Sequence, residues 1–268
     1  MSSLLNKELG IAAGIAVTSF VAGNLAARYM SATPTPPKEQ QSAKQDNLKK
    51  SRTADEYVEE NSLREPAVLK ELREYTFKNV PMAKMVSDPC QIQFFRLLLN
   101  MLDAKKCIEV GTYTGYNVLS TALTIPSDGV IYALDVNEDY VKEGYPFFEK
   151  AGVKDKIVVK IGPAVESLDE LISKGETETF DFIYVDADKI SYEKYLDRAI
   201  LLLKSGGILA FDNMLQGGLV LDLTQEMTPE QRHSAEFLYK LNQKLKLDNR
   251  FQLSFLNIAD GVTLCRKL

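Results

Sequence analysis

The stretch FDFIYVDADKI, residues 180–190, joins an apolar run to a cluster of charged residues. Apolar runs of this length are typical of strands that are buried on both faces of a parallel sheet. The run ends on Asp186, and Asp188 and Lys189 follow at once. In open α/β sheets, ligands bind beyond the carboxyl ends of the strands. The stretch therefore predicts a buried strand with a ligand site at its carboxyl end.

Similar runs recur along the chain and alternate with segments of helical length, a pattern that predicts parallel strands joined by crossover helices. Two further helical patterns precede them, at about 55–78 and 88–103, and another lies near 229–246. The predicted parallel strands are 107–110, 129–135, 155–162, 180–186 and 206–213, and the helices between and after them are 115–125, 138–151, 164–174 and 190–204.

The last two apolar runs, RFQLSFLN and VTLCRKL, are separated by IADG. The Asp260-Gly261 pair is a strong turn signal, so the two runs are expected to pair as an antiparallel hairpin. The predicted fold class is α/β: a mostly parallel seven-stranded sheet with a C-terminal antiparallel hairpin and helices on both faces.

Composition excludes several classes of protein. The net charge of −5 argues against nucleic-acid binding, which usually depends on a basic face. The three cysteines lie far apart and indicate a reduced compartment without a disulfide framework. Because His233 is the only histidine, a multi-histidine metal site is excluded; its polar surroundings predict a solvated helix residue.

The N-terminal region differs from the rest of the chain. Residues 9–27 carry no charge over a length that roughly spans a bilayer core, and positive residues follow them. We expect a membrane anchor at residues 1–30, a Pro-, Ser-, Gln- and Lys-rich flexible linker at 31–53, and a folded domain at 54–268. The expected localisation is a single-pass membrane protein with a cytosolic domain. A cleaved secretory signal or an organelle-directing segment is the alternative.

Four acidic residues, Glu109, Asp135, Asp186 and Asp212, lie in or at the ends of four predicted strands. Any one of these residues by itself would be interpreted as a cap of the helix that follows it. Because parallel strands bring their carboxyl ends to one edge of the sheet, the four together predict a ligand site.

The segment EVGTYTGYN, residues 109–117, favours one type of nucleoside cofactor. Gly111 and Gly115 allow a sharp turn and close approach to a ligand, but their spacing is not the GxGxxG of dinucleotide sites. Asp135 is suited to binding ribose hydroxyls, as in NAD and S-adenosylmethionine sites. Glu109 would repel a pyrophosphate and attract a sulfonium, so it favours S-adenosylmethionine.

Several motifs, in order and with matching spacing, resemble those of the metal-dependent O-methyltransferases of the caffeoyl-CoA and catechol type. They are IEVGTYTGYNVLSTAL, GPAVESLDEL, FDFIYVDADKISYEKY, GGILAFDN and DGVTLCRKL. The resemblance covers residue 66 to the C-terminus. It implies a Rossmann-like class I methyltransferase fold, S-adenosylmethionine and a divalent cation as cofactors, and a homodimer. The cofactor-binding residues that it implies are Ser87, Glu109, Gly111, Thr112, Tyr113, Asn117, Asp135, Ala164 and Asp186.

The same resemblance implies a metal site at Asp186, Asp212 and Asn213, whose oxygen donors suit Mg²⁺ or Ca²⁺. It also implies that Lys189 is catalytic, together with Asp186. The cation would bind neighbouring oxygens of the substrate and make a phenol more acidic, and Lys189 would take the proton. Asp188 is left as a helix cap, an orienting residue or a weak ligand.

The sequence departs from the family on the acceptor side. Plant-type enzymes usually have a tryptophan soon after the DN motif, whereas this chain has none. We therefore expect a small catechol-like or other phenolic acceptor rather than transfer of the caffeoyl-CoA specificity. Two alternatives stay open: a noncatalytic cofactor-binding or interaction protein that retains the fold, and a nicotinamide oxidoreductase.

Overall fold

The computed structural model describes residues 53–268. The chain divides into two compact units, residues 1–57 and 58–268, and only the first helical turn of the described region belongs to the first unit. The anchor and almost all of the linker predicted from the sequence therefore lie outside the described residues.

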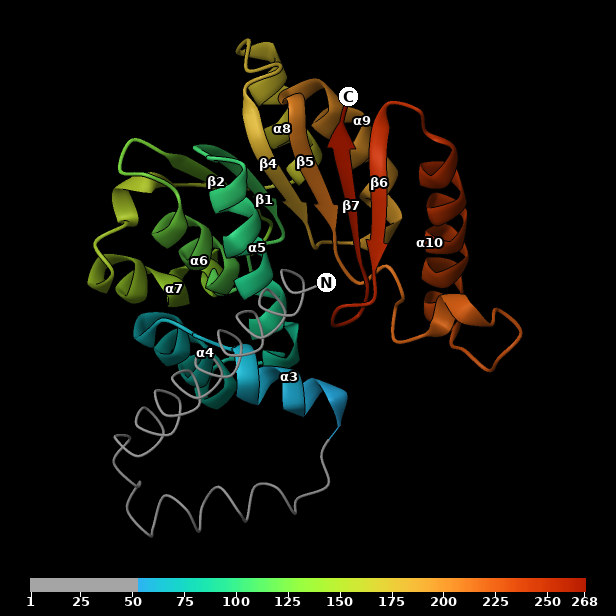
Figure 1. The fold of residues 1–268 in the computed structure, drawn as a ribbon, viewed down its shortest axis with the longest axis horizontal. Coiled ribbons are helices and arrows are strands. Elements are labelled where there is room, and N and C mark those ends of the chain that lie inside the picture. The colour runs from blue at the N-terminus through green and yellow to red at the C-terminus, as the bar shows by residue number, and fades with distance from the viewer. Residues whose placement is uncertain (1–52) are drawn as a thin grey trace, which may run out of the picture. The chain divides into compact units, whose positions relative to one another are not determined.

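The second unit is built on a seven-stranded sheet with the order β3-β2-β1-β4-β5-β7-β6 (Figure 1). Strands β1 to β5 are parallel, and β7 runs antiparallel to both β5 and β6. The predicted fold class, including the C-terminal hairpin, is confirmed. The strands are β1 (Lys106–Val110), β2 (Val130–Asp135), β3 (Ile157–Ile161), β4 (Phe180–Val185), β5 (Leu203–Phe211), β6 (Phe251–Leu256) and β7 (Val262–Lys267).

Helices cover both faces of the sheet, because the apolar side chains of each strand alternate between two cores. One core packs α4, α5, α6 and α7 against side chains such as Cys107 and Phe182, and the other packs α8, α9 and α10 against Ile108 and Ile183. The α-helices are α3 (Ala54–Ser62), α4 (Ala67–Asn79), α5 (Pro89–Met101), α6 (Tyr116–Thr124), α7 (Glu138–Lys150), α8 (Ala164–Ser173), α9 (Tyr192–Leu202) and α10 (Pro229–Leu247). Short 3₁₀ helices are η1 (Ala83–Met85), η2 (Lys154–Lys156), η3 (Lys189–Ser191) and η4 (Leu219–Leu221).

Among the boundaries that differ from the prediction, one changes the number of helices. The single helical pattern expected at about 55–78 is two helices, α3 and α4, separated by residues 63–66. Pro66 lacks a backbone N–H and disfavours helical conformation in the residue before it, so a continuous helix is interrupted here.

The membrane localisation predicted from the sequence is not supported by the described helices. Among the helices formed by residues 53–268, none is long and apolar enough to cross a membrane. Even the 19-residue α10 carries charged side chains along its length, at Glu230, Arg232, Glu236, Lys240, Lys244 and Lys246. The apolar run at 9–27, on which the prediction rested, is outside the described residues.

Candidate active site

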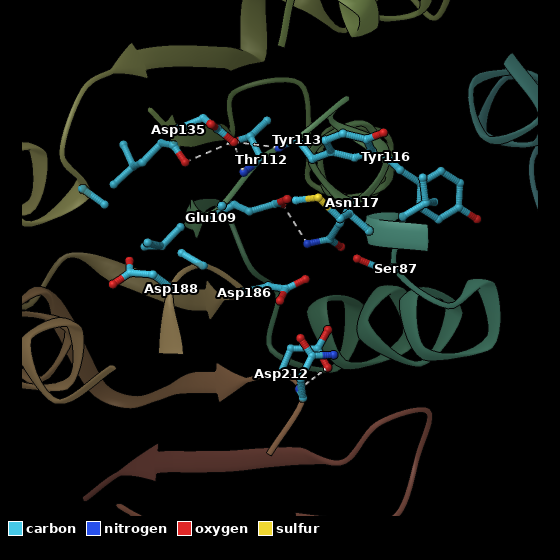
Figure 2. A pocket seen from close by; sticks show the side chains of 18 of the residues that line it. Ser87, Glu109, Thr112, Tyr113, Tyr116, Asn117, Asp135, Asp186, Asp188 and Asp212 are labelled. Carbon is cyan, nitrogen blue, oxygen red and sulfur yellow. Dashed lines mark hydrogen bonds between the residues drawn. The ribbon is translucent and has the colours of Figure 1, made fainter. Parts of the chain in front are cut away.

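A pocket of about 870 Å³ opens at the carboxyl ends of the parallel strands (Figure 2). The loops after β1, β2, β4 and β5 form most of its wall, as expected for an open parallel sheet. Every site residue predicted from the sequence lines it: Ser87, Glu109, Gly111, Thr112, Tyr113, Asn117, Asp135, Ala164, Asp186, Lys189, Asp212 and Asn213. The fold thus brings together residues that are up to 126 positions apart, Ser87 and Asn213 being the extremes.

Asp135 shapes the loop that follows β1. Its Oδ2 accepts hydrogen bonds from the backbone N–H groups of Thr112 and Tyr113, both at 2.8 Å, and its Oδ1 accepts one from Asn137 N, also at 2.8 Å. The two bonds to Oδ2 use both of its lone pairs, whereas Oδ1 keeps one. Asp135 therefore organises the loop and still offers one acceptor site to a ligand.

Gly111 makes the tight approach between the β1 loop and the β4 loop possible. Its φ is +92°, and a Cβ atom at this position would lie 2.2 Å from the carbonyl oxygen of Asp186. Both backbones are fixed, because Gly111 N donates to Leu134 O at 2.9 Å and Asp186 N donates to Val110 O at 2.8 Å. Only glycine fits here without displacing the backbone.

Glu109 is a buried acid at the floor of the pocket, 2% exposed. Asn117 Nδ2 donates to its Oε2 at 2.7 Å. Burial raises the pKa of Glu109 well above its ordinary value, and the negative charges of Asp186 and Asp135 raise it further. A cation bound nearby would relieve this unfavourable environment.

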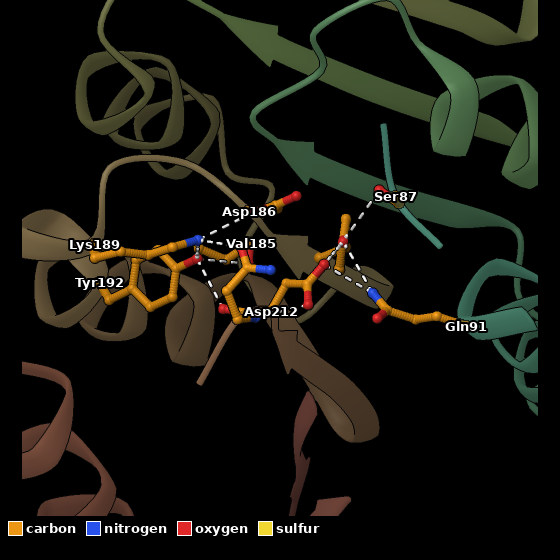
Figure 3. A network of polar contacts seen from close by, with 9 residues as sticks. Ser87, Gln91, Val185, Asp186, Lys189, Tyr192 and Asp212 are labelled. Carbon is orange, nitrogen blue, oxygen red and sulfur yellow. Dashed lines mark hydrogen bonds and ion pairs between the residues drawn. The ribbon is translucent and has the colours of Figure 1, made fainter. Parts of the chain in front are cut away.

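Lys189 joins two of the predicted metal ligands. Its Nζ donates to Asp186 Oδ1 at 3.1 Å, to Asn213 Oδ1 at 2.7 Å and to the hydroxyl of Tyr192 at 2.6 Å (Figure 3). The oxygens of Asp186 and Asn213 therefore converge on a single positive charge. The sequence analysis did not predict Tyr192, although a tyrosine one helical turn after the predicted catalytic lysine is a signal that could have identified it.

Asp212 is held by a buried network that the sequence reasoning did not foresee. Its Oδ2 accepts hydrogen bonds from Gln91 Nε2, at 2.8 Å, and from the hydroxyl of Tyr184, and its Oδ1 accepts one from Asn213 N at 2.6 Å. Burial and the negative charge of Asp186 raise the pKa of Asp212 to about 6. The signal for Tyr184 was present, since a tyrosine inside a buried strand needs a partner for its hydroxyl.

The structure also gives the surroundings of Asp188, His233 and Cys107. Asp188 stands at the N-cap position of η3 but makes no side-chain capping bond, so the interpretation as a helix cap is wrong. Its Oδ1 instead accepts a hydrogen bond from the Tyr195 hydroxyl at 2.6 Å. His233 is exposed on α10 and is not among the residues that line the pocket, whereas Cys107 is buried in the core.

The predicted metal site is not a cluster of acidic side chains alone, because it combines carboxylate oxygens with an amide oxygen. Within residues 53–268 no group of three or more His, Cys, Asp or Glu side chains is placed to hold a metal ion. The predicted set has two carboxylates, Asp186 and Asp212, and the amide of Asn213. A site that uses the amide oxygen as its third ligand suits hard cations such as Mg²⁺ and Ca²⁺.

Comparison with known proteins decides the family. Residues 59–268 match the family model described as O-methyltransferase. The chain belongs to the O-methyltransferase family. A relative from Arabidopsis thaliana, named as a probable caffeoyl-CoA O-methyltransferase, is 45% identical over 225 residues, which cover 82% of this chain and 96% of the relative. The caffeoyl-CoA O-methyltransferase of Eucalyptus gunnii is 42% identical and covers 80% of this chain and 86% of its own length.

Solved structures agree with this assignment. A methyltransferase from Podospora anserina with SAH bound has a TM-score of 0.72 and 26% identity, covering 88% of this chain and 99% of that one. An O-methyltransferase from Bacillus cereus in complex with SAH has a TM-score of 0.67 and 25% identity, covering 80% and 96%. The predicted activity, S-adenosylmethionine-dependent O-methyl transfer, is confirmed.

Proposed function

We propose that this O-methyltransferase uses a divalent cation, Mg²⁺ or Ca²⁺, and methylates a hydroxyl of a small catechol-like or other phenolic acceptor. The observation that carries the proposal is the convergence of Asp186 Oδ1 and Asn213 Oδ1 on the ammonium of Lys189, next to Asp212 in the same pocket. These oxygens fit a hard cation, and a positive charge is already stabilised between two of them.

The methyl donor would be held by the loop after β1 and by Asp135. S-adenosylmethionine supplies a methyl group on a positively charged sulfur. Glu109 provides a buried carboxylate that favours this charge, Asp135 Oδ1 offers a lone pair to a ribose hydroxyl, and the backbone at Gly111 permits close approach. Ser87 and Ala164 contribute to the wall of the same pocket.

Asp186, Asp212 and Asn213 would hold the metal, which would supply Lewis-acid stabilisation to the acceptor oxygen. Lys189 is the proposed general base. Its Nζ lies within hydrogen-bonding distance of Asp186 Oδ1 and Asn213 Oδ1, beside the proposed cation site, and after losing its own proton it would accept the proton of the acceptor hydroxyl. The Tyr192 hydroxyl, 2.6 Å away, fixes the position of Nζ.

The acceptor class is proposed from the names of the relatives and from the wall of the pocket. The relatives above are named for caffeoyl-CoA, a phenolic thioester. In this chain, Met85 and Val86 form an apolar part of the pocket wall. Ala259 and Asp260 line the pocket from the loop between β6 and β7. No residue from 214 to 231 lines the pocket, so the segment that replaces the plant-type tryptophan does not add a wall to it.

Assembly as a homodimer is also proposed, on the family resemblance. Leu253 and Phe255 are 38% and 45% exposed on β6, the edge strand of the sheet, and apolar groups on an edge favour a partner. Sedimentation equilibrium of the purified protein tests this, and a monomeric mass at micromolar concentration would contradict it.

Methyl transfer from labelled S-adenosylmethionine to a panel of catechols, with and without chelator, tests the function. We expect chelation to abolish turnover and added Mg²⁺ to restore it. Asp186→Ala should lose turnover and metal dependence together, and Lys189→Met should lose about 10²–10⁴-fold in kcat. Asp128→Asn is the matched control, because Asp128 is an exposed carboxylate paired with Lys105 outside the pocket. Full activity of Asp186→Ala in chelator would refute the metal-assisted mechanism.

A further inference from the structure

Asp212 is fixed by two buried side chains from elements that are distant in the sequence (Figure 3). Gln91 comes from α5 and Tyr184 from β4, and each is 1% exposed. Both donate to the same atom, Asp212 Oδ2. Neither was implied by the family resemblance, and neither has a role in the mechanism described above.

The Tyr184 hydroxyl uses all of its hydrogen-bonding sites within this network. The single hydroxyl proton of Tyr184 goes to Asp212, because an ionised carboxylate only accepts. The hydroxyl oxygen then accepts from Gln91 Nε2 at 3.3 Å and from Ser87 Oγ at 3.5 Å. The tyrosine ring is held edge-on against Phe95, with the ring centroids 5.1 Å apart. The hydroxyl therefore has one position and one orientation.

The consequence for Asp212 is that its two oxygens are not equivalent. Oδ2 has two side-chain donors, which fill both of its lone pairs. Among residues 53–268, Oδ1 accepts only from Asn213 N, which leaves it one lone pair. Rotation of the carboxylate plane away from this orientation would break both buried hydrogen bonds, and buried groups without partners are costly.

We infer that Tyr184 and Gln91 are positioning residues that hold Asp212 Oδ1 available to the cation. This inference rests on the proposed function, since it assigns Asp212 to the metal. Residues that orient metal ligands in this way typically change metal affinity by about 10–100-fold when they are removed. Ser87, a predicted cofactor contact, completes the network and connects it to the methyl-donor side of the pocket.

Binding of Mn²⁺ to the purified full chain tests the inference, with the free Mn²⁺ signal in electron paramagnetic resonance as the readout. Tyr184→Phe removes only the hydroxyl and keeps the ring against Phe95. Gln91→Met removes the amide with little change in size. Tyr75→Phe is the matched control, because it removes a tyrosine hydroxyl from a carboxylate, Glu143, that is not among the pocket residues.

We expect the Mn²⁺ Kd to rise about tenfold or more in Tyr184→Phe. Gln91→Met should raise it as well, and Tyr75→Phe should leave it within twofold. Urea unfolding of each variant shows whether a change in affinity accompanies loss of the fold, and an equal rise in Tyr75→Phe would overturn the inference.

The inference and the proposed function fail in different ways. If the unmodified protein binds no Mn²⁺, the metal site itself is wrong and the inference falls with it. If the unmodified protein binds Mn²⁺ and Asp186→Ala abolishes binding, the metal site stands. Unchanged affinity in both Tyr184→Phe and Gln91→Met would then refute the positioning role alone.

Discussion

Replacement of Gly111 by alanine tests the contact on which the pocket depends. The new Cβ would lie 2.2 Å from the carbonyl oxygen of Asp186, about 1 Å inside an ordinary carbon–oxygen contact. The φ of +92° is also unfavourable for an L-residue, at about 1–2 kcal/mol. Overpacking against a backbone that is pinned by hydrogen bonds adds about 1–3 kcal/mol. The expected total loss of stability is therefore about 2–5 kcal/mol, a large fraction of the stability of an ordinary domain.

Gly152→Ala isolates the contact from the backbone conformation. Gly152 has a φ of +66°, but a Cβ there would meet nothing within 4 Å. Its substitution should cost about 1 kcal/mol for the left-handed conformation alone. Urea unfolding followed by circular dichroism gives both free energies, and calorimetric titration with S-adenosylmethionine gives the effect on the pocket.

The two outcomes are distinct. Gly111→Ala should be less stable than Gly152→Ala by at least 1 kcal/mol, and its affinity for S-adenosylmethionine should fall, because the strain moves either the β1 loop or the backbone of Asp186. Equal stabilities of the two variants, with unchanged cofactor affinity in Gly111→Ala, would show that the close approach of the two loops is not required.

Three further predictions concern buried charge and packing. Asp181→Asn should cost about 2 kcal/mol at neutral pH, because Asp181 accepts from the backbone amides of Lys105 and Lys106 and pairs with the ammonium of Lys204. Burial acts to raise the pKa of Asp181, but these partners outweigh it and the net pKa is lowered, so the stability gap should shrink as pH falls below about 4 in urea titrations; a gap that stays constant over the acid range would contradict this. Because the pKa of Glu109 is raised by burial and a bound cation favours its ionised form, S-adenosylmethionine affinity should weaken as pH falls, by up to about tenfold per pH unit, and Glu109→Gln should remove that contribution in calorimetry. Leu238→Ala, at a fully buried position of α10, should cost about 2–5 kcal/mol by thermal unfolding, and a loss under 1 kcal/mol would mean that α10 repacks.

Local sequence was sufficient for the sheet and for the edge that carries the pocket. Apolar runs such as 180–185 fix strands by composition, and the turn residues Asp260 and Gly261 fix the hairpin. The local pattern predicted one helix at about 55–78, but Pro66 interrupts it, and the structure has two helices, α3 and α4. The apolar run at 9–27 led to the prediction of a membrane protein, whereas no helix formed by residues 53–268 is long and apolar enough to cross a membrane.

Local patterns are enough to predict the order of strands and helices and the acids at the strand ends, since both depend on neighbours along the chain. The contacts of those acids arise only when the chain folds. Gln91 reaches Asp212 across 121 positions and Tyr184 reaches it across 28, and no periodicity encodes such pairs. The physical reason is that a buried carboxylate needs donors close to it in space. The packing of α5 on the sheet supplies Gln91, and the pairing of β4 with β5 supplies Tyr184.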